Sequence, residues 1–195
     1  MTFAGCMPMR GRSCPAFLFL PKNAKPPYQT VVLFPTAYAR QVPSSDSLDL
    51  GTFEFLIRSG RALIYPVYQG TFERRRNVQR GSSGVRDMQV QWAKDVFRTV
   101  DYLATRPEID MERLAYYSLS MGAFFGPIPV ALEPRFKVAV FAAGGLRYGV
   151  APEVQPANFA PEVRVPVLVV HGADDFGVPK ADQLRFVELL GTLAH

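Results

Sequence analysis

The chain has 195 residues, of which 48% are hydrophobic and 12% aromatic, so it can bury a core and is predicted to form a single domain over residues 1–195. The net charge of +5 is modest, and the arginines gather in one run, FERRRNVQR at 72–80. No nucleic-acid motif accompanies that run, which is interpreted as a solvated loop, so no nucleic-acid partner is expected. No apolar run has the length of a membrane span or the pattern of a signal peptide, so a cytoplasmic protein without a membrane partner is expected.

Two cysteines, Cys6 and Cys14, lie near the N-terminus. They are predicted to be reduced thiols, with a bridge that closes a small loop as the alternative. Because no second cysteine pair accompanies them, neither a metal site nor a cofactor is predicted.

Short apolar runs alternate with longer amphipathic ones, a pattern typical of the α/β class. The first strand is predicted at 15–21, and the run TVVLFP at 30–35 predicts a buried central strand. A helix is predicted over 47–60 and should end at Gly60, where a left-handed residue is expected. Its apolar stripe consists of Leu50, Phe53, Leu56 and Ile57.

The middle of the chain continues with a strand at 61–68 and a long helix within 84–109 that stops before Pro107. A strand at 113–120 then leads into Ser120. The apolar residues that recur at helical spacing in the long helix are Met88, Trp92, Val96, Val100 and Leu103.

The segment after Ser120 should form a helix that is interrupted. Proline is tolerated only in the first turn of a helix, and Pro127 and Pro129 lie beyond that turn. A break or restart of the helix is therefore predicted near Gly126.

The last third of the chain holds buried strands at 136–145 and 165–172 and a final helix at 180–194. Buried strands joined by helices imply a mostly parallel sheet with helices on both faces. Ligands of such sheets bind at the carboxyl ends of the strands, where the turns after 113–120 and 165–172 fall.

Ser120 is the candidate nucleophile. A serine attacks a carbonyl when a base takes its proton and donors hold the oxyanion. The stretch from Ser118 to Gly122 follows the G-x-S-x-G nucleophile elbow with serine in place of the first glycine. The flanking positions must be small because strand and helix nearly touch. In the alternative frame, with Ser118 as nucleophile, Tyr116 would occupy a small position and clash.

Candidate acids follow the strand at 165–172. A carboxylate on the turn after a late strand can orient a histidine and stabilise its cation. Asp174 and Asp175 are both available. His171 precedes them closely and is predicted to be a structural histidine that hydrogen-bonds within the turn.

The stretches AYYSLSMGA (115–123) and PVLVVHGADDFGVPKADQ (166–183) resemble the α/β-hydrolase superfamily, in the branch of dienelactone hydrolases, prolyl-oligopeptidase-type peptidases and related esterases. The likeness runs from about residue 15 to the end of the chain. It implies an α/β-hydrolase fold and a serine hydrolase that cleaves small-molecule carboxylic esters through an acyl-enzyme. The pattern H-G-x-x-D-x-x-V-P, which begins at His171, points to Asp175 as the acid.

The same resemblance implies that the oxyanion hole is formed by the backbone N–H groups of Met121 and of Ala37, in a loop where Thr36 replaces a common glycine. The family places its histidine after the acid, beyond one more helix and strand. Only His195 follows Asp175, at a separation of 195 − 175 = 20 residues, which is enough for the helix but not for the strand. His195 is the candidate base, although its place at the far end of that helix puts it at the wrong edge of the sheet. A histidine of a neighbouring subunit, or of residues absent from this sequence, is the alternative. The fold is therefore expected to lack the C-terminal strand and His loop, and the domain to be shortened at both ends.

Two alternatives remain open at this point. The domain could be a catalytically impaired relative that serves as a binding or interaction module, or an inactive fragment. A missing last strand would also leave a bare sheet edge, so a homodimer through that edge is expected.

Overall fold

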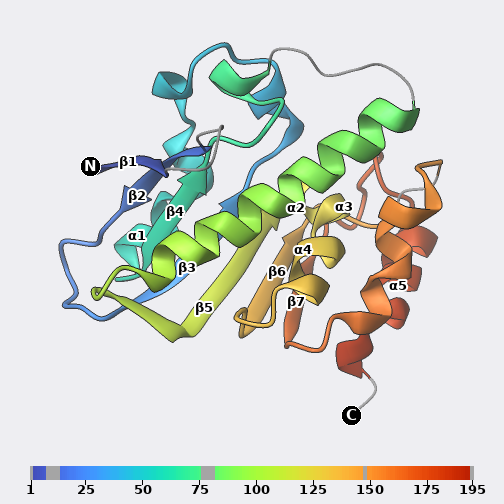
Figure 1. Cartoon of the computed structure of the whole chain (residues 1–195). Helices are drawn as coiled ribbons and strands as arrows, with labels where there is room; N and C mark the ends of the chain where they lie inside the picture. Colours follow the sequence, from blue (N-terminus) through green and yellow to red (C-terminus); the bar gives the residue numbers. More distant parts are fainter. Residues whose placement is uncertain (1, 8–13, 76–81, 147–148, 194–195) are drawn as a thin grey trace.

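The computed structural model describes residues 2–7, 14–75, 82–146 and 149–193. Seven strands of these ranges form one sheet in the order β1-β2-β4-β3-β5-β6-β7 (Figure 1). The pairs β1–β2 and β2–β4 are antiparallel, and all other pairs are parallel. The mostly parallel sheet is confirmed. The strands are β1 (Thr2–Met7), β2 (Cys14–Phe19), β3 (Tyr28–Phe34), β4 (Ala62–Pro66), β5 (Ile109–Leu119), β6 (Val138–Ala142) and β7 (Val167–Val170).

Helices cover the two faces of the sheet unequally (Figure 1). One face carries α2, α3, α4 and α5, and α1 packs on the other face with the short 3-10 turns that precede it. The helices are α1 (Glu54–Arg58), α2 (Ser82–Ala104), α3 (Met121–Phe125), α4 (Pro127–Leu132) and α5 (Lys180–Leu189).

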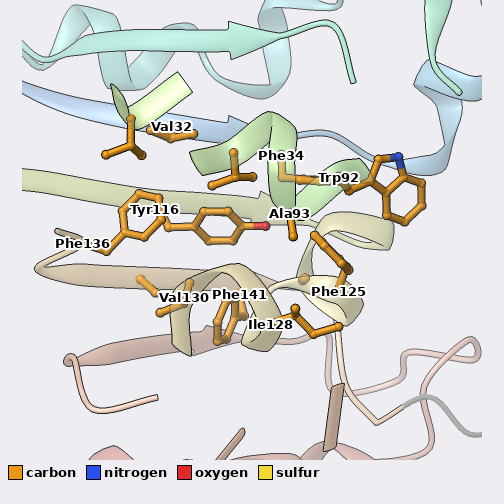
Figure 2. Close-up of a cluster of buried hydrophobic side chains, with 14 of the residues drawn as sticks. Val32, Phe34, Trp92, Ala93, Tyr116, Phe125, Ile128, Val130, Phe136 and Phe141 are labelled. Atoms are coloured by element: carbon orange, nitrogen blue, oxygen red, sulfur yellow. The ribbon is translucent and has the colours of Figure 1, made fainter. Parts of the chain in front are cut away.

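The two cores arise from the alternation of side chains along the central strands. In β3, Val32 and Phe34 face the core beneath α2, whereas Leu33 faces the core beneath α1. Figure 2 shows the larger core, in which Phe34, Trp92 and Phe125 lie close together. Burial of each large apolar side chain contributes about 1.5–3 kcal/mol, so this cluster is a main source of stability.

The predicted helix over 47–60 is wrong in extent. Two 3-10 turns and the five-residue α1 replace it. The Asp49 side chain accepts a hydrogen bond from the Gly51 N–H at 3.1 Å, and this local bond competes with helical pairing. Phe53, with φ −146° and ψ −5°, separates the second turn from α1. The end at Gly60 is confirmed, since its φ is +87°.

The predicted final helix over 180–194 is too long, because α5 ends at Leu189 and a 3-10 turn follows at Gly191–Leu193. The predictions for the long helix and for the break after Ser120 hold. The stripe of the long helix is buried at all five predicted positions of α2, and the helix ends before Pro107. The break near Gly126 is also confirmed, because α3 ends there and Pro127 opens α4. A Cβ on Gly126 would lie 2.4 Å from Phe141, so the junction between α3 and α4 requires glycine.

The sheet of the described residues ends at β7 on one side. Leu168 and Val170 of this edge strand are 57% and 47% exposed. Self-association through the edge stays a prediction, which light scattering at high concentration would test. Within the residues that the structure describes, none of the helices is both long and apolar enough to cross a membrane.

Candidate active site

Ser120 occupies a strained turn between β5 and α3. Its φ of +47° and ψ of −108° are unusual for a residue with a side chain. The Ser120 N–H donates to the Ala142 carbonyl at 2.8 Å, and the Ser120 carbonyl accepts from Ala123 and Phe124, each at 2.9 Å. Strand β6 and the first turn of α3 therefore hold the strained backbone in place.

Small residues flank this turn, as the elbow pattern predicts. A Cβ on Gly122 would lie 2.6 Å from the Phe34 carbonyl oxygen, so only glycine lets α3 approach β3. Ser118 is fully buried, and its hydroxyl donates to the Val140 carbonyl at 3.1 Å. Serine is accommodated at this position because its polar group finds a partner inside the sheet. The Ser118 hydroxyl is thereby separated from solvent.

A cavity of about 540 Å³ opens beside Ser120. Most of its lining is apolar or aromatic, which is typical of sites for small organic ligands. Ser120, Met121 and Ala37 share this cavity, so the structure brings the candidate nucleophile and both candidate oxyanion donors together. The remaining lining residues are Arg40, Val85, Met88, Gln89, Trp92, Phe124, Phe125, Gly149, Val150 and Pro156.

Two residues that line the cavity have backbone N–H groups without protein partners in the described part of the chain. Among the hydrogen bonds of the described residues, none uses the N–H of Met121 or of Ala37. Thr36, which precedes Ala37, accepts a hydrogen bond from the Tyr38 N–H at 3.3 Å. The Thr36 side chain therefore caps the 3-10 helix Ala37–Arg40. Both free N–H groups are available to an anionic oxygen.

Asp175 lies on the loop after β7, and its carboxylate is fixed by that loop. Its Oδ1 accepts hydrogen bonds from the Gly177 N–H at 2.8 Å and the Val178 N–H at 3.2 Å. Oδ2 accepts none within the described part of the chain. Asp174 is exposed, whereas Asp175 is half-buried.

The loop over 171–179, called the acid loop below, lies at the same end of the sheet as Ser120 but outside the cavity lining. One strand, β6, separates β5 from β7. A Cβ on Gly145, just after β6, would lie 2.6 Å from Val178 and 4.0 Å from Phe124. The loop after β6 therefore lies between the loop after β7 and helix α3, which begins directly after Ser120.

His171 does not behave as predicted. Neither ring nitrogen has a hydrogen-bond partner among the described residues, although both are buried. The predicted hydrogen bond within the turn is wrong, because the turn is closed instead by the Asp175 carboxylate. Burial lowers the pKa of His171, and the nearby charge of Asp175 opposes that effect. His195 lies outside the described residues.

The arginine run contains a buried ion pair that the sequence did not reveal. Arg74 lies 2.8 Å from the Oδ2 of Asp95 on α2, and the Asp95 side chain is 1% exposed. The solvated-loop prediction is wrong for Arg74, and residues 76–80 lie outside the described residues. Asp95 also accepts from the Gln69 N–H at 2.9 Å, and Trp92 donates to the Gln69 carbonyl at 2.7 Å. This network ties the loop after β4 to the helix that lines the cavity.

Cys14 is a free, buried thiol next to this network. Burial and the charge of Asp95 raise its pKa to about 12. No three His, Cys, Asp or Glu side chains of the described ranges gather as a metal site.

Gln89 and Arg40 line the cavity, and sequence reasoning missed both. Gln89 directly follows Met88, which belongs to the predicted apolar stripe of the long helix. This position at the edge of the stripe was the sequence signal that could have placed Gln89 near the cavity. Arg40 had no such signal, because its place depends on how the loop after β3 folds back beside Ser120.

Comparisons with known proteins agree with this geometry. Residues 14–192 match the family model of the dienelactone hydrolase family. A search of curated proteins found no match.

Solved structures share the fold at low sequence identity. A Klebsiella pneumoniae subsp. pneumoniae MGH 78578 protein assigned as a dienelactone hydrolase has 20% identity and a TM-score of 0.74, covering 97% of this chain and 80% of its own. Est1E from Butyrivibrio proteoclasticus, solved with ferulic acid bound, has 16% identity and a TM-score of 0.71, covering 96% and 86%. Pyrococcus horikoshii acylaminoacyl peptidase has 15% identity and a TM-score of 0.70, covering 98% of this chain and 34% of its own.

The family match covers residues 14–192, which is most of the chain. The chain therefore belongs to the dienelactone hydrolase family, a family of hydrolases with the α/β-hydrolase fold.

Proposed function

We propose that the chain is a serine esterase that hydrolyses small-molecule carboxylic esters, with Ser120 as the nucleophile. The observation that carries this proposal is the position of Ser120 in a strained turn that opens into a cavity with two unused backbone donors. Strain of this kind persists only where the surrounding structure imposes it, and it clusters at functional sites.

The reaction follows from the groups that meet in the cavity. The Ser120 hydroxyl gives its proton to a histidine while its oxygen forms a bond to the ester carbonyl carbon. The N–H groups of Met121 and Ala37 bind the resulting oxyanion, which is worth about 10²- to 10³-fold in rate per donor. The carbon–oxygen bond to the alcohol then breaks, the histidine returns the proton to the alcohol, and water hydrolyses the acyl-enzyme.

Asp175 is proposed to orient that histidine and stabilise its cation. Its Oδ1 is occupied by two backbone N–H groups of its loop, and its Oδ2 accepts no hydrogen bond from the described residues. We assign the base to His195, because it is the one histidine that follows Asp175 in the printed sequence. A histidine from a second copy of the chain, or from residues outside the printed sequence, is the alternative. His171, the other histidine, immediately follows β7. It is the residue with which His195 is compared in the variants below.

An ester substrate is favoured by the relatives. Est1E was solved with ferulic acid, and a further neighbour of 18% identity and TM-score 0.69 is a cold-adapted esterase from an Arctic intertidal metagenomic library. The lining of the cavity, largely apolar, fits an acyl group better than a charged peptide.

The test is hydrolysis of p-nitrophenyl acetate and butyrate by the chain and by single variants. Ser120→Ala should lose at least about 10⁴-fold in kcat, since removing the nucleophile leaves only binding and the oxyanion hole. The exposed Ser59→Ala is the matched control and should retain activity. Labelling by a fluorophosphonate should map to Ser120.

Histidine variants identify the base. His195→Ala should lose activity to a degree similar to Ser120→Ala, and His171→Ala should not. The opposite result would assign the base to His171. Ester turnover that survives Ser120→Ala, or the absence of any adduct on Ser120, would contradict the proposed function and favour a binding module.

A further inference from the structure

Gln89 lines the cavity beside Ser120 and has a side-chain oxygen without a hydrogen-bond partner in the described part of the chain. The residue is only 7% exposed, and its Oε1 is buried with no hydrogen-bond partner among the described residues. Gln89 nevertheless lines the same cavity as Ser120. Because an unsatisfied buried polar group destabilises the folded protein, such a group at a cavity wall indicates a ligand that completes it.

The other residues on this wall do not compete for that role. Val85, Met88 and Trp92 lie three or four positions from Gln89 or adjacent to it, and they form one face of α2 toward the cavity. Trp92 uses its indole N–H on the Gln69 carbonyl at 2.7 Å. On this face of α2, Gln89 is therefore the residue whose polar side chain can still form a hydrogen bond with a ligand.

We propose that Gln89 selects esters whose apolar, aromatic part carries a hydroxyl group; the ester linkage itself rests on the proposed function. A hydroxyl both donates and accepts, so it pairs with the amide in either orientation of its terminal bond. Met88, Trp92 and Phe125 supply the apolar wall for the ring. The cavity, at about 540 Å³, has the volume of known sites for small organic ligands.

The selectivity follows from the unpaired amide. A ring without the hydroxyl would leave the buried Gln89 Oε1 without a hydrogen bond, whereas the hydroxylated ring would pair with it. A site that hydrogen-bonds a substrate hydroxyl rejects the analogue that lacks it, and a buried polar group left unpaired corresponds to about 10- to 100-fold in kcat/KM.

The first experiment compares methyl 3-(4-hydroxyphenyl)propanoate with methyl 3-phenylpropanoate. The unmodified chain should prefer the hydroxylated ester by about 10- to 100-fold in kcat/KM. Gln89→Met and Gln89→Leu keep a similar volume without the amide and should reduce the preference to about threefold or less. Gln29→Met, on β3 away from the cavity, is the matched control and should retain the preference.

Equal kcat/KM values for the two esters in the unmodified chain would overturn the inference. Retention of the preference in both Gln89 variants would overturn it too. Thermal melts show that the variants are folded, and their Tm should equal or exceed that of the unmodified chain, because an unsatisfied buried amide has been replaced by an apolar group.

A binding measurement separates this inference from the esterase proposal. In a Ser120→Ala background, calorimetry compares 3-(4-hydroxyphenyl)propanoic acid with 3-phenylpropanoic acid. If the hydroxylated acid binds more tightly and Gln89→Met abolishes that difference, the role of Gln89 is supported even when no ester is turned over. In that case only the esterase proposal fails. Ester turnover without any Gln89-dependent selectivity would overturn the inference and leave the proposed function intact.

Discussion

The serine side and the acid side of the candidate site are built in different ways. Around Ser120 the packing is so close that Gly122 has no room for a Cβ against Phe34. Asp175 instead follows the edge strand β7, where Leu168 is exposed, and it is held by N–H groups of its own loop. The core therefore fixes the geometry of the serine, whereas a local turn fixes that of the acid.

This difference predicts how each side responds to substitution. Changes at the serine turn should disturb the core and lower the free energy of unfolding. Changes at the acid loop should leave the fold intact and affect the chemistry. Three tests follow, from the largest expected effect to the smallest, and the first two include a matched control variant.

Asp175→Asn should reduce kcat by about 10³-fold while leaving Tm nearly unchanged. The amide cannot stabilise a histidine cation as a carboxylate does, but its oxygen can still accept from Gly177 and Val178. Steady-state kinetics on a p-nitrophenyl ester and a thermal melt measure both quantities.

Asp174→Asn is the matched control, since Asp174 is an exposed neighbour in the same loop. It should retain kcat within about twofold, as expected of a surface substitution. Equal losses in the two variants would contradict the assignment of Asp175 as the acid.

Gly122→Ala should lower the free energy of unfolding by about 3 kcal/mol, because the new Cβ would lie 2.6 Å from the Phe34 carbonyl oxygen. Denaturation by urea, monitored by circular dichroism, measures this loss. In the acid loop, Gly172→Ala places a Cβ at an ordinary 3.9 Å from Asp175 and should change stability by less than about 0.5 kcal/mol. A similar loss in both variants would remove the contrast between the two sides.

His171 should make the fold less stable in mild acid. Its pKa is lowered in the folded chain by burial, so below the ordinary value of 6.5 the unfolded state binds more protons than the folded state. Stability should therefore fall as the pH drops below 6.5 toward the lower pKa of the folded chain, and Tm measured on both sides of 6.5 would show the loss. His171→Gln should flatten that dependence; an unchanged slope would contradict it.

The elbow could be predicted from the sequence because its requirements are local. A strand that ends at a serine with small residues on both sides has few alternatives, and Ser118 and Gly122 both lie where strand and helix touch. The break at Gly126 followed from the two prolines for the same reason. The extent of the helix over 47–60 was not predictable in this way. Its apolar periodicity favours a helix, whereas the hydrogen bond that Asp49 accepts from the Gly51 N–H favours a turn, and both signals are local.

Other features of the site depend on contacts between distant segments. Arg74 and Asp95 are 21 positions apart and meet only because the loop after β4 folds onto α2. Gln89 and Arg40 reach one cavity from a helix and a loop that lie on opposite sides of β4 in the chain. No pattern within either segment specifies that meeting.

The sequence by itself determined the α/β class, the strands of the parallel sheet and the serine turn, because these depend on periodicity and on residue size at neighbouring positions. The choice of Asp175 over Asp174 as the candidate acid came instead from the resemblance to the family pattern. Only the tertiary structure decided which groups share the cavity: two free backbone donors, an unpartnered amide and an aromatic wall. Their convergence depends on the packing of α2 and the loop after β3 around the end of β5, and such long-range packing is not encoded in any one segment of the chain.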